Sequence, residues 1–352
     1  MLACVKTDMG KVEMVDLPVP KAGPGQIVVR TTLTTICGTD MHFLDEIPTA
    51  ALAGAYPNIV VPQGMLMGHE GIGIVHEVGE GVKQFQVGDR VVASCLTSCG
   101  KCAECMHGDF SVCTGGGTLL AGCQAEYFVV PDADVSAAKV PEGVTDEQGI
   151  LPGDIMSTGF GAIDRAGARF GDSVAIFAQG PVGLCATAGA AARGCGLIVA
   201  VDTIPERLEM SKRFGANVTI NAKEKDPVAE IMALTEGQGV DIAVEAVGTQ
   251  ATFEAATRVV CRGGTVSSVG VYGLTPAISM PTLVPSFLHR HIVTTLCPSG
   301  RDRLEHMLAV IKYRGVDLSP LYTHRMKLSD APKAYELFRS KKEGVLKIAL
   351  VP

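Results

Sequence analysis

The segment VAIFAQGPVGLCATAGAAARGCGLIVAVD, at residues 174–202, combines two apolar runs with a stretch of small residues between them. The runs Val174–Ala178 and Leu197–Val201 each have the length and composition of a buried strand. The intervening residues Pro181–Arg193 follow a glycine turn and are long enough for a helix. A strand, a glycine turn, a helix and a second strand predict one βαβ unit of a parallel sheet.

The same alternation continues through the second half of the chain. Further buried strands are predicted at Val240–Ala246 and Thr265–Val269, and another strand at Ile292–Leu296. Helices are predicted at Ile155–Arg165, Pro205–Phe214, Pro227–Thr235 and Ala251–Val260. Strands that alternate with helices are typical of an α/β fold with a doubly wound parallel sheet, the Rossmann arrangement.

The first 150 residues have a different, β-rich pattern of short apolar runs separated by Gly, Pro and Asp. These runs are Ile27–Val29, Ile72–Val78, Arg90–Ala93 and Tyr127–Val130. The C-terminal tail, with helices predicted at Arg301–Arg314 and Ala331–Ser340 and a strand at Val345–Val351, is too short for a core of its own. We therefore expect two domains, a β-rich one from residues 1–153 and 297–352 and an α/β one from residues 154–296.

The composition of the 352 residues argues against several classes of protein. With 47% apolar and 19% charged residues, the chain is not disordered as a whole. The net charge is −7 and no basic block is present, which argues against nucleic-acid binding. No signal-peptide profile or membrane span is recognisable, so we expect a cytoplasmic protein. Its twelve cysteines should then be reduced, and closely spaced ones favour metal binding over disulfides.

The turn formed by Gly180, Pro181, Val182 and Gly183 has the features of a dinucleotide site. Gly180 stands where the backbone would meet the pyrophosphate, and Gly183 stands where the helix packs closely on the strand. Pro181 suits the first turn of a helix because it has no N–H to lose. Ala178 replaces the first glycine of the usual fingerprint, so the match is imperfect.

Asp202 follows the second predicted strand, about 20 residues beyond the turn. Its carboxylate could accept hydrogen bonds from both ribose hydroxyl groups of the adenosine and would repel a 2′-phosphate, which favours NAD over NADP. The structural alternative is a cap for the helix that starts near Pro205. Arg207, one turn later, could contact the ribose edge or tolerate a phosphate.

Four cysteines follow the pattern C-x2-C-x2-C-x7-C, at Cys99, Cys102, Cys105 and Cys113. Four thiolates satisfy a tetrahedral zinc ion and leave no open position for chemistry, so we expect a structural zinc here. Disulfides between such close neighbours would be strained. An iron–sulfur cluster or redox-active thiols remain as alternatives.

A second group of metal-binding residue types is spread over the first 154 residues. Cys37, His69 and Asp154 supply a thiolate, an imidazole and a carboxylate, which suit zinc and leave a fourth position open. The two anions would neutralise Zn²⁺, so we interpret the adjacent Glu70 as a neighbour of the ligands or a transient ligand. The structural alternative for Asp154 is an N-cap of the helix at Ile155–Arg165.

Taken together, these motifs resemble the zinc-dependent medium-chain alcohol dehydrogenase family over essentially the whole chain. The resemblance rests on the ordered series Cys37-Gly-Thr39-Asp-x-His42, Gly-His69-Glu70, the four cysteines, Asp154-x-x-x-Thr158-Gly159, Gly180-Pro-Val-Gly183, Asp202 and the tail Tyr322-Thr-His324-Arg325. Asp154 as third zinc ligand and His42 resemble the bacterial secondary-alcohol branch. The four cysteines and Asp202 instead resemble NAD-dependent relatives that act on polyols, threonine or small aldehydes.

The resemblance implies a GroES-like catalytic domain, a Rossmann domain and the reversible oxidation of a small secondary alcohol to a ketone, or of a primary alcohol to an aldehyde. Zinc would act as a Lewis acid on the alcohol oxygen, and NAD would accept the hydride. Thr39 would pass on the released proton, and His42 would exchange it with solvent by way of the nicotinamide ribose. The structural alternatives are a local hydrogen bond for Thr39 and a solvated position for His42.

Further cofactor contacts are implied by the same resemblance. Val247, Gly248, Val269 and Val271 would line the cofactor at strand ends, and Thr158 would approach the nicotinamide. Lys347 matches a basic residue that pairs with the pyrophosphate, and its alternative is a solvated lysine. By analogy, we expect a homodimer or homotetramer that acts on a small-molecule substrate.

Other functions remain open at this point. Within the family, the substrate could be a polyol, a butanediol or a threonine-type compound. Outside it, the chain could be a non-catalytic NAD-binding protein or a zinc-free quinone reductase on the same fold. Either of these should have lost a zinc ligand, whereas Cys37, His69 and Asp154 are all present.

Overall fold

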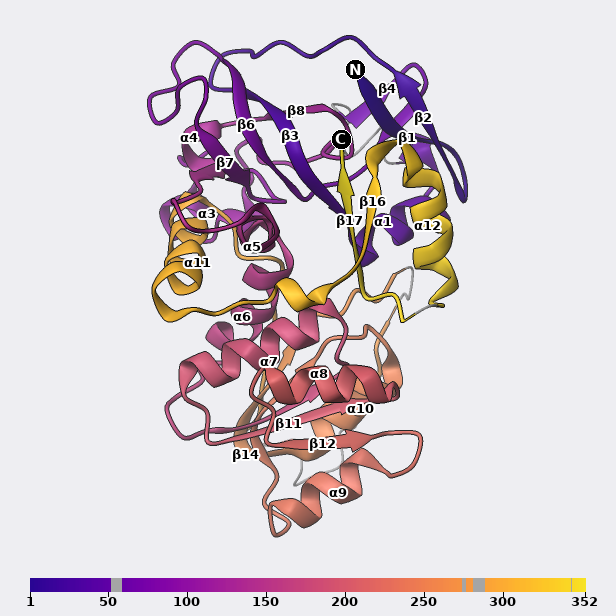
Figure 1. Cartoon of the computed structure of the whole chain (residues 1–352). Helices are drawn as coiled ribbons and strands as arrows, with labels where there is room; N and C mark the ends of the chain where they lie inside the picture. Colours follow the sequence, from indigo (N-terminus) through magenta and orange to yellow (C-terminus); the bar gives the residue numbers. More distant parts are fainter. Residues whose placement is uncertain (52–58, 274–276, 281–288, 343) are drawn as a thin grey trace. The chain divides into compact units, whose positions relative to one another are not determined.

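The computed structural model describes residues 1–51, 59–273, 277–280, 289–342 and 344–352 (Figure 1). It comprises two compact units, one formed by Met1–Ser157 and Cys297–Pro352 and the other by Thr158–Leu296. We expected Asp154 to open the α/β part, but it lies in the first unit. The reason is local, because the preceding Gly153 carbonyl accepts a hydrogen bond of 2.8 Å from the Cys95 amide of that unit.

The second unit contains a six-stranded sheet in which every neighbouring pair is parallel. Its order is β12 (Val218–Asn221), β11 (Leu197–Asp202), β10 (Ser173–Phe177), β13 (Val240–Glu245), β14 (Val260–Ser268) and β15 (His291–Thr294). The order reverses between β10 and β13, which is where open α/β sheets bind ligands. The predicted doubly wound parallel sheet is confirmed, although the short edge strand β12 was not predicted.

The inner strands β10 and β11 are buried on both faces, which explains why they are almost continuously apolar. Alternate residues of β10 and β11, such as Val174 and Ile198, pack against α6 (Ile155–Arg165) and α7 (Pro181–Arg193). The residues between them, such as Phe177, pack on the opposite face with side chains of α9 (Pro227–Leu234) and α10 (Gln250–Val259). The remaining helix, α8 (Pro205–Arg213), contacts β11 and β12.

Local sequence signals account for the ends of these helices. Helices α7, α8 and α9 each have proline in the first turn, where a missing N–H costs no hydrogen bond. Asp226 and Thr249 cap α9 and α10 by accepting backbone N–H bonds. Helix α7 ends at Gly194, whose φ of 82° is the left-handed geometry that glycine adopts at little cost.

The first unit is β-rich, as predicted, and contains two sheets. The smaller has the order β2 (Lys11–Asp16), β1 (Leu2–Asp8), β5 (Gly64–Leu66) and β4 (Val60–Val61). The larger has the order β16 (Tyr322–Lys327), β17 (Lys347–Val351), β3 (Ile27–Ile36), β6 (Gly71–Val78), β7 (Arg90–Ala93) and β9 (Ala137–Lys139), with β8 (Tyr127–Val130) also paired to β3. Its helices are α1 (Gly38–Asp45), α3 (Ala103–Met106), α4 (Ala133–Ser136), α5 (Asp146–Ile150), α11 (Arg301–Arg314) and α12 (Ala331–Ser340). Its 3-10 turns are η2 (Phe110–Val112), η3 (Leu151–Gly153), η4 (Ser319–Leu321) and η5 (Leu328–Asp330).

The C-terminal tail completes this unit rather than forming a separate one. Strand β17 is antiparallel to β3, with Ile348 opposite Ile36, and lies beside β3 and β16 in Figure 1. Helix α12 contributes the buried Tyr335 to a core that also contains Leu44 of α1. In the described part of the chain, none of the helices has the length and apolarity needed to cross a membrane.

Candidate metal centre and cofactor site

Three loops of the first unit bring Cys37, His69 and Asp154 together. Cys37 is the N-cap of α1, directly after β3, His69 precedes β6, and Asp154 follows η3. The Asp154 Oδ2 atom lies 3.4 Å from Cys37 Sγ and 3.2 Å from His69 Nε2. One ligand atom from each residue lies within 4.8 Å of the others, and we call this set the three-ligand cluster.

The donor set of this cluster fits zinc. A thiolate, an imidazole nitrogen and a carboxylate oxygen are the ligands of open zinc sites, and His69 and Asp154 are 3% and 8% exposed. Burial raises the pKa of the Cys37 thiol to about 11, and the charge of Asp154 adds to this effect. Burial alone would raise the pKa of Asp154 too, but the hydrogen bond from His69 holds it below the usual value. A divalent cation would offset the cost of a buried thiolate.

A buried carboxylate behind the cluster fixes the orientation of the imidazole, and sequence analysis did not single it out. Asp40 Oδ1 lies 3.0 Å from His69 Nδ1, and Asp40 Oδ2 accepts the Cys37 amide at 3.0 Å. Gln124 donates to the same Oδ2 atom at 3.3 Å and accepts from the Tyr335 hydroxyl at 2.8 Å. His69 Nε2 therefore faces Asp154 and the metal position. Burial lowers the pKa of His69, but Asp40 and Asp154 raise it above the usual value.

Replacing Asp40 with alanine should weaken zinc binding about 10- to 100-fold, because the ligand His69 loses the partner that orients it. The zinc dissociation constant, measured by competition with a chromophoric chelator, checks this expectation. Asp45→Ala is the matched control, since Asp45 lies on the same helix but pairs with Arg339 at the surface. Equal zinc affinity in the two variants would contradict the role of Asp40.

Glu70 and Lys347 form a buried ion pair with 2.6 Å between Nζ and Oε2. Glu70 also accepts a hydrogen bond from Thr35, and it does not belong to the three-ligand cluster. A transient contact of Glu70 with zinc stays a prediction. The alternative of a solvated Lys347 is wrong, because the side chain is buried and Glu70 raises its pKa despite burial. Pairing with a pyrophosphate stays a prediction.

The two residues predicted to move a proton lie on α1, next to the first ligand. Thr39 Oγ1 is 3.9 Å from Cys37 Sγ, so the hydroxyl borders the metal position. His42 Nδ1 lies 2.8 Å from Glu46 Oε1 one turn further along the helix, with 31% of its side chain exposed. His42 is thus paired rather than merely solvated. Its route to Thr39 stays a prediction.

The four predicted cysteines also converge, and we call the loop that carries them the four-cysteine lobe. The Sγ atom of Cys102 is 3.4 Å from that of Cys105 and 3.7 Å from that of Cys113. Ligands 2.3 Å from a tetrahedral ion are about 3.8 Å apart, so the lobe fits zinc. The backbone amides of Cys99 and Cys102 donate to the sulfurs of Cys113 and Cys99. Hydrogen bonds from backbone amides, above all that of Cys105, lower the pKa of the Cys102 thiol to about 6.

We expect Cys102→Ser to lose one zinc ion per chain and to lower the Tm by several degrees, because a zinc ion bound by the four cysteines would hold the lobe together. Metal analysis and thermal unfolding in parallel check this expectation. Cys261→Ser, which changes a cysteine outside the lobe, should leave both unchanged. Iron in place of zinc would instead favour the iron–sulfur alternative, and an unchanged metal content would contradict the zinc site.

The predicted dinucleotide turn has the expected geometry around Gly183. A Cβ atom at Gly183 would lie 1.9 Å from the carbonyl oxygen of Ala178, so only glycine fits between α7 and the end of β10. At Gly180, the N-cap of α7, no atom lies within 4 Å of such a Cβ, so the backbone is open to a ligand. Ala178 has a φ of 78°, which shows that the residue replacing the first glycine still adopts a left-handed conformation.

Asp202, at the end of β11, is held by three backbone donors. Its Oδ2 atom accepts the Gln179 amide at 2.5 Å, and Oδ1 accepts those of Thr203 and Ile204 at 2.7 and 2.9 Å. The carboxylate therefore joins the dinucleotide turn to the residues just before α8. The structural alternative, a cap for α8, is thus met in part, because Asp202 accepts amides at the start of that helix. Arg207 lies in the first turn of α8 and is half-buried. Their contacts with a ribose stay predictions.

Glu245, at the end of β13, is a buried carboxylate that sequence analysis missed. Its Oε1 atom accepts the amides of Val247 and Gly248 at 2.8 and 2.9 Å and the Thr252 hydroxyl at 2.8 Å. Its Oε2 atom accepts the Tyr272 hydroxyl at 2.9 Å. Glu245 thus holds in place the loop that carries Val247 and Gly248, two of the predicted cofactor contacts.

The other predicted cofactor residues also border this part of the second unit. The Val269 amide donates to the Glu245 carbonyl at 2.9 Å, directly after β14. The side chains of Val247 and Val271 are unusually exposed for valine, at 42% and 48%, and are available to a ligand. Thr158 is buried within α6.

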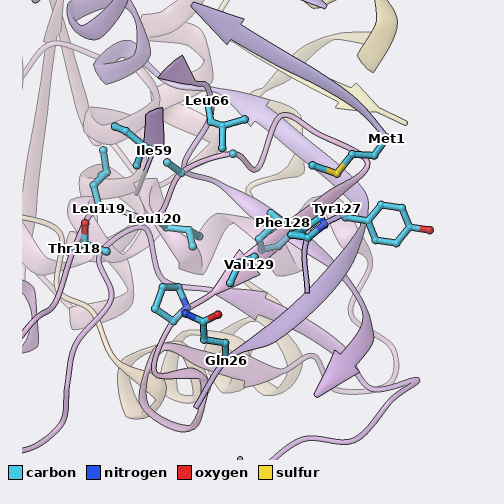
Figure 2. A pocket seen from close by; sticks show the side chains of 14 residues that line it. Met1, Gln26, Ile59, Leu66, Thr118, Leu119, Leu120, Tyr127, Phe128 and Val129 are labelled. Carbon is cyan, nitrogen blue, oxygen red and sulfur yellow. The ribbon is translucent and has the colours of Figure 1, made fainter. Parts of the chain in front are cut away.

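A cavity of about 330 Å³ lies in the first unit (Figure 2). Its lining includes Met1, Gln26, Leu66, Leu120 and Tyr127. None of the described residues around it belongs to the predicted metal or cofactor sites. We therefore do not assign the proposed reaction to this cavity.

Comparisons with known proteins match the whole chain. Residues 23–142 match the family model "Alcohol dehydrogenase GroES-like domain", and residues 181–312 match "Zinc-binding dehydrogenase". An alcohol dehydrogenase of Cupriavidus necator is 42% identical, with 100% of this chain and 99% of the relative covered. An NADP-dependent isopropanol dehydrogenase of Thermoanaerobacter brockii is 34% identical, with 97% of each covered. The solved alcohol dehydrogenase TADH of Thermus sp. ATN1 has a TM-score of 0.89 at 33% identity, with 100% of this chain and 99% of that chain covered.

Proposed function

The chain belongs to the zinc-dependent medium-chain alcohol dehydrogenase family, and on this premise we propose that it reversibly oxidises a small secondary alcohol to a ketone with NAD as hydride acceptor. The observation that carries the proposal is the three-ligand cluster, because its thiolate, imidazole and carboxylate suit a zinc ion with one open position. A primary alcohol oxidised to an aldehyde, or a polyol, butanediol or threonine-type substrate, would use the same chemistry.

Zinc at this cluster would polarise the alcohol oxygen, and NAD would supply the hydride acceptor. The protein's own residues hold and move the proton. Thr39 lies beside Cys37, where its hydroxyl can accept the proton of the substrate hydroxyl and pass its own outward. His42, partly exposed on the same helix, can exchange that proton with solvent. The Glu70–Lys347 pair is neutral overall, so it leaves the charge balance of the three ligands unchanged.

The choice of NAD rests on Asp202. A carboxylate at the end of β11 repels the 2′-phosphate of NADP, and each of its oxygens can accept more than one hydrogen bond. The Thermoanaerobacter brockii relative is NADP-dependent, so the family alone does not decide the cofactor. A structural zinc in the four-cysteine lobe, a cytoplasmic location and a homodimer or homotetramer complete the proposal.

A panel of secondary alcohols, diols and amino alcohols assayed with NAD and NADP in parallel tests this proposal. We expect a higher kcat/KM with NAD, and we expect Asp202→Asn to reduce the NAD/NADP preference roughly tenfold, which is about 1.4 kcal/mol. Asparagine removes the charge and keeps one oxygen that can accept the amides of Thr203 and Ile204, but its NH2 group cannot accept the amide of Gln179. Asp226→Asn, which changes the cap of α9, is the matched control. A wild-type preference for NADP would overturn the role of Asp202.

A non-catalytic NAD-binding protein is the candidate of another class. It would bind NAD but turn over none of the alcohols in the panel. The complete set of ligands and the orienting Asp40 argue for catalysis, because a binding protein has no need of them.

A further inference from the structure

Two buried thiols that the proposed reaction does not use lie next to Asp154. Cys95 and Cys297 are 3% and 5% exposed. Cys95 Sγ lies 3.7 Å from Asp154 Oδ1, and Cys297 Sγ lies 3.5 Å from the Asp154 carbonyl oxygen. The two sulfurs and one carboxylate oxygen all lie within 4.8 Å of one another.

Backbone hydrogen bonds on both sides fix these thiols in place. The Cys95 amide donates to the Gly153 carbonyl at 2.8 Å, and the Cys95 carbonyl accepts the Leu120 amide at 2.8 Å. The Cys297 carbonyl accepts the Ser299 hydroxyl at 3.0 Å. Three segments that are distant in the sequence thus present two sulfurs to one carboxylate.

The two oxygens of Asp154 face two different groups of donors. Its Oδ2 atom faces Cys37 and His69, at 3.4 and 3.2 Å, whereas Oδ1 faces Cys95. A carboxylate with this arrangement can bridge two cations, one at each oxygen. Thiolates are soft ligands, so the cation at Oδ1 would be Zn²⁺ or Cd²⁺ rather than Mg²⁺ or Ca²⁺.

We propose that Cys95, Cys297 and the Oδ1 atom of Asp154 form a second soft-metal site, which shares Asp154 with the three-ligand cluster. Charge is balanced when both positions are filled, because two divalent cations meet three thiolates and one carboxylate. Each thiol gives its proton to solvent as the ion binds, so no oxidant or reductant is needed. This site goes beyond the proposed alcohol oxidation and does not depend on it.

Metal analysis of the reduced full-length protein tests the site. The wild type and the variants C95A and C297A are saturated with Zn²⁺, dialysed and analysed for zinc per chain. We expect each variant to hold one ion fewer than the wild type. C185A is the control, because Cys185 is buried in α7 and belongs to none of the candidate metal groups of the described residues. Equal zinc content in wild type, C95A and C297A would overturn the proposal.

Cadmium loading distinguishes a separate ion at Cys95 and Cys297 from an arrangement in which Cys95 is only a further ligand of the ion at Cys37. Each Cd²⁺–thiolate bond adds charge-transfer absorption in the ultraviolet. If Cys95 and Cys297 hold their own ion, either single variant loses the absorption of both thiolates together with one ion. If Cys95 were only a fourth ligand of the ion at Cys37, C95A would lose the absorption of one thiolate and no ion, which contradicts the proposal. A C95S variant, closer in size to cysteine, replaces C95A if the latter does not fold.

Discussion

Replacing Asp154 with alanine should lower kcat/KM for alcohol oxidation at least about 1,000-fold, which corresponds to about 4 kcal/mol of transition-state stabilisation. Asp154 is the only carboxylate of the three-ligand cluster, and its Oδ2 atom contacts both other ligands. Without it, zinc would keep two ligands, one of them neutral, and the buried site would carry an unbalanced positive charge. We therefore expect weak zinc binding and almost no turnover.

NADH formation and zinc content, measured on the same samples, check this expectation. Asp146→Ala is the matched control, because Asp146 is a partly exposed aspartate of the same unit that pairs with Arg90. It should keep its activity and its metal. An Asp154→Ala protein that folds and oxidises alcohol at the wild-type rate would contradict the assignment of the catalytic metal.

We expect the second large effect from Gly183→Ala, which should abolish NAD binding. The added Cβ would lie 1.9 Å from the Ala178 carbonyl oxygen, which belongs to the backbone and cannot rotate away. Either α7 or the left-handed turn at Ala178 must shift, and such overpacking costs about 1–3 kcal/mol or more. We expect a lower Tm as well as the loss of the pyrophosphate site.

Gly180→Ala separates the two effects because its Cβ would meet no atom within 4 Å. It should leave the Tm unchanged and weaken NAD binding, since the methyl group occupies the space predicted for the pyrophosphate. The fluorescence of added NADH reports binding. Wild-type affinity for NADH in Gly183→Ala would contradict the position of the cofactor.

Periodic and local signals allowed much of the fold to be predicted. Helices α7 and α11 have the predicted bounds. Proline marks the start of α7 and glycine its end, whereas the spacing of apolar residues marks α11. Strand β12 was missed because only Ile220 among its four residues is buried, so no apolar run marks it. The predicted boundary before Asp154 lies four residues ahead of the division after Ser157, and the Cys95 amide donates to the Gly153 carbonyl within the first unit.

The convergence of Cys37, His69 and Asp154 could be predicted because the ordered series of motifs resembles one family. Their supporting residues could not. Asp40, Gln124 and Tyr335 are separated by 84 and 211 residues along the chain and meet only in the folded unit. The same holds for Lys347, whose partner Glu70 is 277 residues away.

The most direct test of the account is the dependence of turnover on the metal at Cys37, His69 and Asp154. The protein is stripped with a chelator, dialysed and titrated with Zn²⁺ while NADH formation from an active alcohol is followed. We predict no turnover in the stripped protein and a return of activity as zinc is restored to the wild type but not to Asp154→Ala. Full turnover by a folded, metal-free chain would contradict it.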